Sequence, residues 1–164
     1  LVTGLVDSLA PKGRVVMVAS EAHRQAPAVG FQFDDLSFEK NYAPFRAYGQ
    51  SKLSNMLFAR ALSKRLAGTG KTANSVHPGV IMTNLPRHMN PVVRAVYPLA
   101  SAIAMKSIEE GAATQTYLVA HPSAEGVTGQ YFADCNPANS TKNSRDDAMA
   151  ERLWQVTEAI VGKL

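Results

Sequence analysis

Tyr48 and Lys52 are the two residues of this chain whose types and spacing best suit proton transfer. They lie four residues apart in a stretch with helical periodicity, which places both side chains on one helical face. A phenol titrates near about 10, and a neighbouring ammonium favours its ionised form, which predicts a lowered pKa for Tyr48. The pair is a candidate general acid or base, although Tyr and Lys also occur at this spacing in helices without catalytic function.

Two predicted strands flank this helix and end at residues with ligand-binding chemistry. The continuous apolar run over 15–19 predicts a strand at 14–19 that is buried on both faces, with Ser20 at its C-terminal end. A second strand is predicted at 73–77, stopped by Pro78–Gly79. Ligands of open α/β sheets bind at the carboxyl ends of the strands, so both ends are candidate binding positions. Alternatively, Ser20 only satisfies a backbone group, and His77 is expected to be structural.

The remaining periodicity predicts an α/β chain. Helices are expected over residues 1–10, 45–67, 91–104, 107–119 and 144–161, a third strand over 129–133 and an irregular connection over 21–43. Ser107 and Ser144 are the expected N-caps of the last two helices. Strands that alternate with helices predict a parallel sheet, with successive strands side by side. At 164 residues, a single domain is the default.

Composition favours a packed globular chain. Hydrophobic residues make up 46% and charged residues 18%, which argues against disorder, and no apolar run approaches the ~20 residues of a membrane span. The net charge of +4 comes from scattered basic residues and a few near one helix end, so nucleic-acid binding is not favoured. Cys135 is the single cysteine and is expected to be a passive thiol in a reducing, cytoplasmic compartment, unless a targeting segment precedes Leu1. No metal site is expected.

Order, residue type and strand context together make the chain resemble the short-chain dehydrogenase/reductase family. The resemblance is carried by Ser20, the Tyr48-x-x-x-Lys52 pair and His77-Pro78-Gly79-Val80 with Thr83. Within the family the chain is similar to the retinol-dehydrogenase-like branch, through Ser20-Glu21-Ala22-His23-Arg24, the long segment between Ser20 and Tyr48, and Gly129-Gln130-Tyr131-Phe132.

One part of the family pattern is missing. The family's N-terminal glycine-rich phosphate turn and the Asn of its catalytic tetrad have no counterpart, and Leu1 falls within the helix before the Ser-bearing strand. The resemblance therefore implies the C-terminal part of a Rossmann-type, doubly wound parallel sheet flanked by helices, as one partial domain over 1–164. The strand at 14–19 would then lack one neighbour and leave a long apolar edge. A homo-oligomer, or pairing with a separate N-terminal half, is expected.

The resemblance implies NAD(P)-dependent interconversion of a carbonyl and an alcohol. Tyr48 would be the general acid or base, Lys52 would tune Tyr48 and contact the nicotinamide ribose, and Ser20 would polarise the substrate oxygen. Branch likeness favours NADP(H), with NAD(H) possible. The implied cofactor contacts are Tyr48, Lys52, Pro78, Gly79, Val80 and Thr83.

The substrate and two other functions remain open. Aromatic residues in 31–45 and the segment 82–105 would frame an apolar cleft for a retinoid, a lipid aldehyde or a similar compound, or the rings only fix a long loop to the core. Epimerases and dehydratases of nucleotide sugars share Tyr-x-x-x-Lys, but little chain follows Val80 to form a substrate domain. The other alternative is a non-catalytic binding or regulatory protein, or an inactive fragment. His23 and His88 have no expected function.

Overall fold

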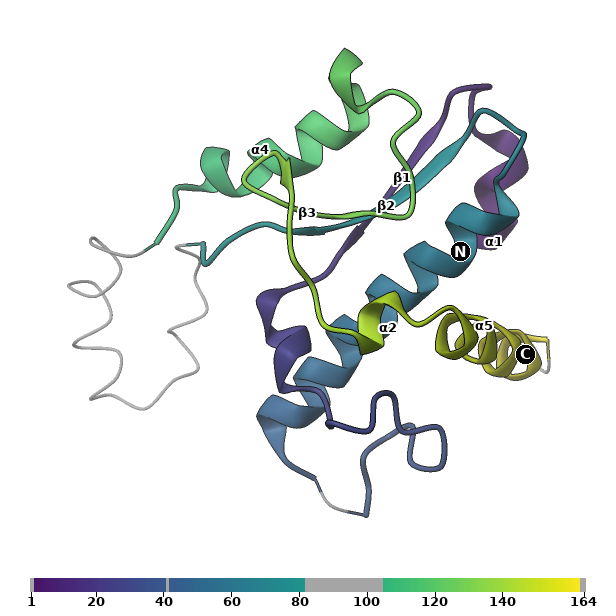
Figure 1. Cartoon of the computed structure of the whole chain (residues 1–164), viewed down its shortest axis with the longest axis vertical. Helices are drawn as coiled ribbons and strands as arrows, with labels where there is room; N and C mark the ends of the chain where they lie inside the picture. Colours follow the sequence, from purple (N-terminus) through teal and green to yellow (C-terminus); the bar gives the residue numbers. More distant parts are fainter. Residues whose placement is uncertain (1, 41, 82–104, 163–164) are drawn as a thin grey trace.

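A computed structural model describes residues 2–40, 42–81 and 105–162 (Figure 1). One sheet contains four strands in the order β1-β2-β3-β4, namely β1 (Arg14–Val18), β2 (Thr72–His77), β3 (Tyr131–Ala133) and β4 (Asn136–Pro137). β1, β2 and β3 are parallel, as predicted, whereas β4 runs antiparallel to β3. β4 was not predicted, because two residues are too few to produce a periodic pattern.

Helices cover both faces of the sheet. α2 (Pro44–Arg65) and α5 (Asp147–Val161) lie on one side, and α4 (Ile108–Ala120) lies on the other (Figure 1). Successive side chains of β1 point to opposite faces of the sheet. Val15 packs against the cluster formed with α2 and α5, and Val16 packs against the cluster formed with α4. The doubly covered parallel sheet expected from the sequence is therefore present in the described part of the chain.

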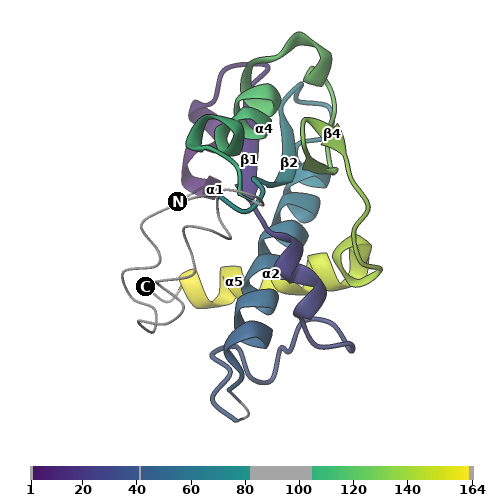
Figure 2. The same cartoon turned by 90° about the vertical axis from the view of Figure 1, so that its left-hand side faces the viewer.

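The larger apolar cluster lies between α2, α5 and the sheet. Its buried members are Leu53, Leu57, Ala61, Leu62, Leu66, Ala73, Ala150, Leu153 and Trp154. In the view of Figure 2, α5 crosses behind α2. Burial of these side chains is the main contribution to the stability of α2 against the sheet. Each large aliphatic side chain contributes about 1.5–3 kcal/mol of folding free energy when it is fully buried.

Basic residues at the end of α2 hold α5 from outside the cluster. Arg60 Nε lies 2.5 Å and Lys64 Nζ 2.7 Å from the carboxylate of Asp147, and Arg65 Nη2 lies 2.9 Å from Glu151. The position of these cations near the end of a helix predicts a favourable interaction with the negative end of the helix dipole. The structure adds that they form ion pairs with the first turns of α5.

The two predicted serine caps have different outcomes. Ser107 is the N-cap of α4: its hydroxyl accepts from Glu110 N at 3.2 Å, and the Glu110 carboxylate accepts from Ser107 N at 2.8 Å. Ser144 is not the cap of α5, because it lies in η5 (Asn143–Arg145) and donates to the Thr141 carbonyl. Asp146 caps α5 instead, accepting from Met149 N at 2.9 Å.

Other predicted boundaries shift or fall outside the described residues. The helix expected over 1–10 is a short turn of α-helix, α1 (Val2–Leu5), followed by the 3-10 turn η1 (Val6–Ser8). The irregular segment 21–43 contains one unpredicted 3-10 turn, η2 (Glu21–Gln25), and another 3-10 turn, η4 (Pro122–Ala124), follows α4. The helix expected over 91–104 lies outside the described residues.

The edge of the sheet at β1 has the expected character. Within the described residues β1 pairs with β2 alone, and Val18 at its end is 43% exposed. None of the helices in residues 2–40, 42–81 and 105–162 combines the length and hydropathy needed to cross a bilayer.

Candidate active site

Tyr48 and Lys52 lie together on the open side of α2. The ammonium of Lys52 is 5.5 Å from the centroid of the Tyr48 ring, and Tyr48 is 48% exposed. Pro44 occupies the first turn of α2, where its missing N–H costs nothing, so the helix begins one turn before Tyr48. The predicted juxtaposition of phenol and ammonium is therefore present, and the phenol is accessible to a ligand.

Ser20 lies immediately beyond β1, where it begins the turn η2. Its backbone is extended, with φ of −164°, and its hydroxyl oxygen accepts a hydrogen bond from Ala22 N at 3.2 Å. The capping function that the alternative interpretation assigned to Ser20 is thus real. Within the described residues it uses the hydroxyl only as an acceptor, which leaves the O–H able to donate to another oxygen.

Two side chains of α2 bind the end of β1. They connect the helix that carries Tyr48 to the strand that leads to Ser20. Asn55 Nδ2 donates to the Val18 carbonyl at 2.9 Å, and Lys52 Nζ lies 3.4 Å from the same oxygen. The carbonyl is two residues before Ser20, so these contacts fix the strand end against the helix that carries Tyr48. Sequence reasoning missed Asn55, whose only signal was its position one turn after Ser51-Lys52.

Gly49 lets η2 approach α2 closely. A Cβ at this position would come within 2.6 Å of Ala26 N and 2.7 Å of Ala22 O, distances that no side chain tolerates. A glycine inside a helix costs roughly 1 kcal/mol relative to alanine. The helix tolerates this cost at the residue next to Tyr48 because the turn that follows Ser20 packs directly on it.

The segment after β2 carries the residues that the sequence predicts as cofactor contacts. Gly79 has a φ of +91°, which side chains rarely adopt, and Val80 is 58% exposed. Lys106 passes over Gly79 and forms an ion pair with Asp134, while Lys106 N donates to the Val80 carbonyl at 2.8 Å. The hydrogen bond and charge of Lys106 hold the pKa of Asp134 below its usual value. Thr83 lies outside the described residues.

His77 ends β2 next to Pro78. Its Nδ1 is buried and has no hydrogen-bond partner in the part of the chain that is described. Burial lowers the pKa of His77, which favours the neutral ring. This agrees with the expected structural assignment of His77 but does not test it.

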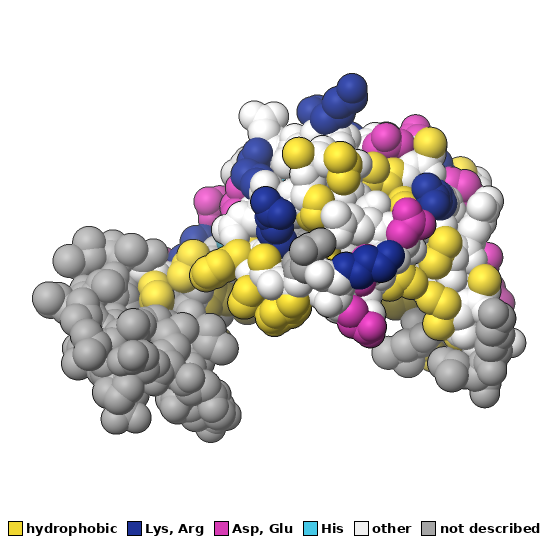
Figure 3. Space-filling model, turned by 90° about the horizontal axis from the view of Figure 1, so that it is seen from below, with side chains coloured by type: hydrophobic (Ala, Val, Ile, Leu, Met, Phe, Trp, Pro, Cys, Tyr) yellow, Lys and Arg dark blue, Asp and Glu magenta, His cyan; other side chains and the backbone are white. Residues whose placement is uncertain are grey.

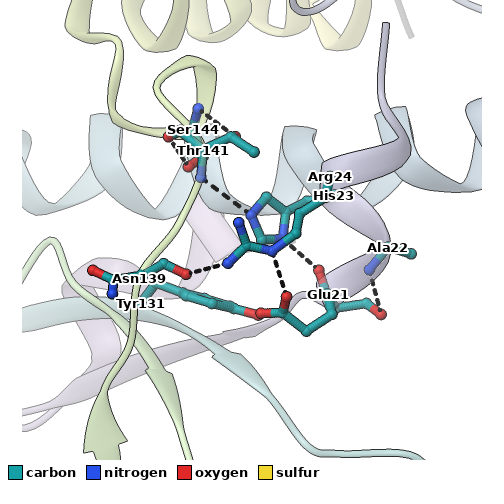
Figure 4. A network of polar contacts seen from close by, with 9 residues as sticks. Glu21, Ala22, His23, Arg24, Tyr131, Asn139, Thr141 and Ser144 are labelled. Atoms are coloured by element: carbon teal, nitrogen blue, oxygen red, sulfur yellow. Dashed lines mark hydrogen bonds and ion pairs between the residues drawn. The ribbon is translucent and has the colours of Figure 1, made fainter. Parts of the chain in front are cut away.

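A polar network fastens η2 to the segment after β3 (Figure 4). Tyr131 Oη donates to Glu21 at 2.8 Å, and Arg24 donates both to Glu21 at 2.5 Å and to the Asn139 carbonyl at 2.7 Å. Burial and the neighbouring Glu21 carboxylate raise the pKa of Tyr131, so its phenol stays protonated and keeps donating. His23 completes the network from the buried side, with 1% exposure.

The same network sets the charge of Glu21. Burial alone would raise the pKa of Glu21, but the hydrogen bonds from Arg24 and Tyr131 outweigh it and leave the pKa lowered. From the sequence alone, Glu21, His23 and Tyr131 contribute only to the family resemblance. Their mutual contacts join segments more than a hundred residues apart, which local patterns cannot reveal.

The aromatic residues of the 21–45 region divide into two groups. Phe31 and Phe33 pack against the larger apolar cluster and Phe38 is 4% exposed, so these three rings fix the loop to the core. Tyr42 and Phe45 are 68% and 74% exposed and lie just before Tyr48. Of the described rings in this region, Tyr42 and Phe45 are the two left exposed to a ligand, and residues 82–104 of the expected cleft lie outside the described residues.

Other candidate chemistries find no support in the described residues. No cluster of three metal-binding side chains occurs in residues 2–40, 42–81 and 105–162. Cys135 is half-buried beside the hydroxyl of Thr114. On the face drawn in Figure 3, the described Lys and Arg side chains lie singly among apolar and acidic ones.

Comparison with known proteins gives the same picture along the whole chain. No family model matches it. The chain is 40% identical to human retinol dehydrogenase 14 over 166 residues, which is 100% of the chain and 48% of that protein. It is 41% identical over 155 residues to the chloroplastic short-chain dehydrogenase TIC 32 B of Brassica napus, covering 93% of the chain and 48% of the relative. The chain thus spans about half the length of the curated relatives it matches.

Solved structures agree in fold. An uncharacterised protein from Mycobacterium paratuberculosis superposes with a TM-score of 0.62 at 27% identity, over 89% of this chain and 49% of that one. A blue fluorescent protein from a metagenomic library, solved with NADPH, superposes with a TM-score of 0.56 at 24% identity, over 80% of this chain and 47% of its own length. The second likeness concerns the fold alone.

Proposed function

The chain belongs to the short-chain dehydrogenase/reductase family, and we propose that it carries the proton-transfer half of an NAD(P)-dependent oxidoreductase that interconverts a carbonyl and an alcohol. The observation that supports this most directly is the geometry of α2. Tyr48 and Lys52 share its open face, with 5.5 Å between ammonium and ring centroid, and the same Lys52 reaches the strand end next to Ser20.

In the proposed reaction Tyr48 gives its phenolic proton to the carbonyl oxygen as the alcohol forms. Lys52 stabilises the phenolate that remains, because an ammonium beside the ring favours negative charge there. Ser20 donates its free O–H to the same oxygen and holds it in place. Acid–base assistance of this type contributes typically ~10²–10⁴-fold in rate. The reverse direction uses the same groups, with the phenolate accepting the alcohol proton.

The end of β2 fits the nicotinamide end of the cofactor, which would supply the hydride when bound. Pro78 has no N–H and Val80 presents an exposed apolar surface on which a flat ring could lie, whereas the Lys106 side chain covers Gly79 and would have to move aside for a close approach there. Lys52 would contact the ribose hydroxyls, and Thr83 the carboxamide or a phosphate. NADP(H) is proposed over NAD(H) from the likeness to the retinol-dehydrogenase branch.

The proposed substrate is a hydrophobic carbonyl compound such as a retinoid or a lipid aldehyde. Two observations support it: the names of the relatives as retinol dehydrogenases, and the exposed rings of Tyr42 and Phe45 just before Tyr48. We further propose that β1 pairs along its open edge with an N-terminal half or a second copy, since parallel strands are normally buried. A cytoplasmic location is part of the same proposal.

Reduction of decanal, followed through NADPH absorbance, tests the proposal. The chain is assayed alone and with the N-terminal half of a relative added. Turnover that requires Tyr48 supports the oxidoreductase. Tight NADPH binding without turnover in either assay would favour the non-catalytic alternative, in which the scaffold only binds.

A further inference from the structure

His23 is buried directly beneath the turn that Ser20 begins. Its Nδ1 is 2.7 Å from the Ser20 carbonyl oxygen, and its Nε2 is 3.4 Å from Thr141 N. A carbonyl only accepts and a backbone N–H only donates, so Nδ1 must carry the proton and Nε2 must accept. Both contacts are therefore satisfied by one neutral tautomer, and burial, which lowers the pKa of His23, favours that neutral form.

We propose that His23 is the positioning residue of Ser20, an inference that rests on the proposed function and adds a residue to it. One nitrogen of the ring holds the peptide that carries the Ser20 side chain. The other is fixed to the segment after β4. The ring thus connects the candidate substrate-polarising hydroxyl to a part of the chain 118 residues away.

The turn needs such a connection because its own hydrogen bonds are weak. η2 is a 3-10 turn of five residues, and i to i+3 bonds have poorer geometry than those of an α-helix. Its position is set instead by contacts from outside: Gly49 beneath it, the Tyr131 phenol on Glu21, and Asn139 on Arg24. The contacts on Ser20 itself come from within the turn: the backbone N–H of His23 donates to the Ser20 carbonyl at 3.0 Å, Ala22 N donates to the Ser20 hydroxyl, and the His23 ring adds a side-chain bond to the same carbonyl. Of these three, the ring contact is the one that a substitution of His23 removes.

Tyr131 supports the ring from the side. The two rings meet edge to face, with centroids 5.3 Å apart and planes at 70°. Tyr131 belongs to β3, so the sheet itself orients the imidazole. A misplacement of about 1 Å in a reacting group can cost ~10²-fold in rate, so a support of this kind matters for turnover more than for folding.

The test compares His23→Phe with His23→Asn in the 164-residue chain, assayed as above. Phenylalanine fills the space but donates nothing, whereas the asparagine amide places an N–H close to the position of Nδ1. We expect His23→Phe to lower kcat for decanal by about 10- to 100-fold with little change in the KM for NADPH. We expect His23→Asn to regain most of that loss, although both variants lose the Thr141 contact. The matched control is His121→Asn, on an exposed histidine away from Ser20 that caps η4 and stacks on Tyr117.

Equal kcat losses in both His23 variants, at equal melting temperatures, would overturn the inference, as would normal kcat in His23→Phe. A second measurement tests the positioning by His23 independently of whether the proposed function is correct. Nitrogen NMR of the imidazole should show a protonated Nδ1 and a bare Nε2, and the Thr141 amide should exchange slowly in wild type and faster in His23→Phe. An Nε2–H tautomer overturns the inference even in an active enzyme, whereas an absence of turnover in wild type both alone and with the N-terminal half added overturns the proposed function and the positioning with it.

Discussion

The two sides of helix α2 differ in burial and in proposed function. On one side Leu53 and Leu57 are completely buried against α5 and the sheet. On the other, Tyr48 and Ser51 are exposed, and Lys52 is only half-buried. The buried side fixes where the helix lies, and the open side carries the groups proposed to react. Stability and chemistry should therefore respond separately to substitutions only a few residues apart.

Tyr48→Phe is the substitution with the largest expected effect, and it acts on the open side alone. Removing one hydroxyl should lower kcat for decanal reduction by at least ~10²-fold, because no other phenol lies beside Lys52 in the described residues. The urea midpoint should stay within error of wild type, since the Tyr48 hydroxyl has no protein hydrogen bond there. Near-normal turnover would remove Tyr48 from the mechanism.

Leu57→Ala is the counterpart on the buried side. Leu57 is 0% exposed within the larger apolar cluster, and truncating such a side chain costs about 2–5 kcal/mol in unfolding free energy. Urea denaturation measures this loss. kcat of the protein that remains folded should change little, because the open side of α2 is untouched. A loss of kcat as large as that of Tyr48→Phe would show that the two sides are not separable.

Gly49→Ala tests the place where the two sides meet. Alanine is the better helix former by roughly 1 kcal/mol, so propensity alone predicts stabilisation. The close contacts with the backbone of Ala22 and Ala26 predict the reverse, by about 1–3 kcal/mol, because backbone cannot move aside cheaply. We expect a lower urea midpoint together with a lower kcat. An increase in stability would mean that η2 does not pack on α2 as described.

Asn55→Ala should give a smaller loss. It removes the 2.9 Å hydrogen bond to the Val18 carbonyl, a contact worth about 0.5–1.5 kcal/mol, and leaves Lys52 as a weaker donor at 3.4 Å. The urea midpoint reports the stability change. Asn55→Asp is the matched control: it keeps the size but cannot donate in its ionised form, so it should be at least as destabilising as alanine.

The sequence predicts most of the fold because the signals that define it are local. Helical spacing marks α2, the apolar run marks β1, and Ser107 with Glu110 marks the start of α4. It also predicts that Tyr48 and Lys52 meet, since a helix fixes that distance. Where two caps compete, as Ser144 and Asp146 do before α5, a local rule cannot choose between them.

The surroundings of Ser20 lie beyond such local rules. Tyr131 and Thr141 reach η2 only after β3 has paired with β2, so their contacts depend on the tertiary fold. The close approach at Gly49 likewise depends on η2, a turn that the residue pattern of 21–43 does not mark. Long-range polar contacts of this kind carry no periodic signature.

The smallest expected effect is a pH dependence that comes from the buried histidines next to the candidate site rather than from the apolar side of α2. Burial lowers the pKa of His23 from its ordinary 6.5, so below 6.5 the unfolded chain binds more protons than the folded one. Stability is therefore fully present above 6.5 and falls as the pH drops below it. His77 has a pKa lowered by burial too and should add to the same dependence.

Urea midpoints measured on either side of pH 6.5 separate these contributions. His23→Asn should reduce the wild-type difference, because asparagine does not titrate, and His77→Asn should reduce it independently. Leu57→Ala should shift both midpoints equally, since removing an aliphatic side chain leaves the proton balance of folding unchanged. A pH dependence that survives both histidine substitutions would move its origin from His23 and His77 to the carboxylates.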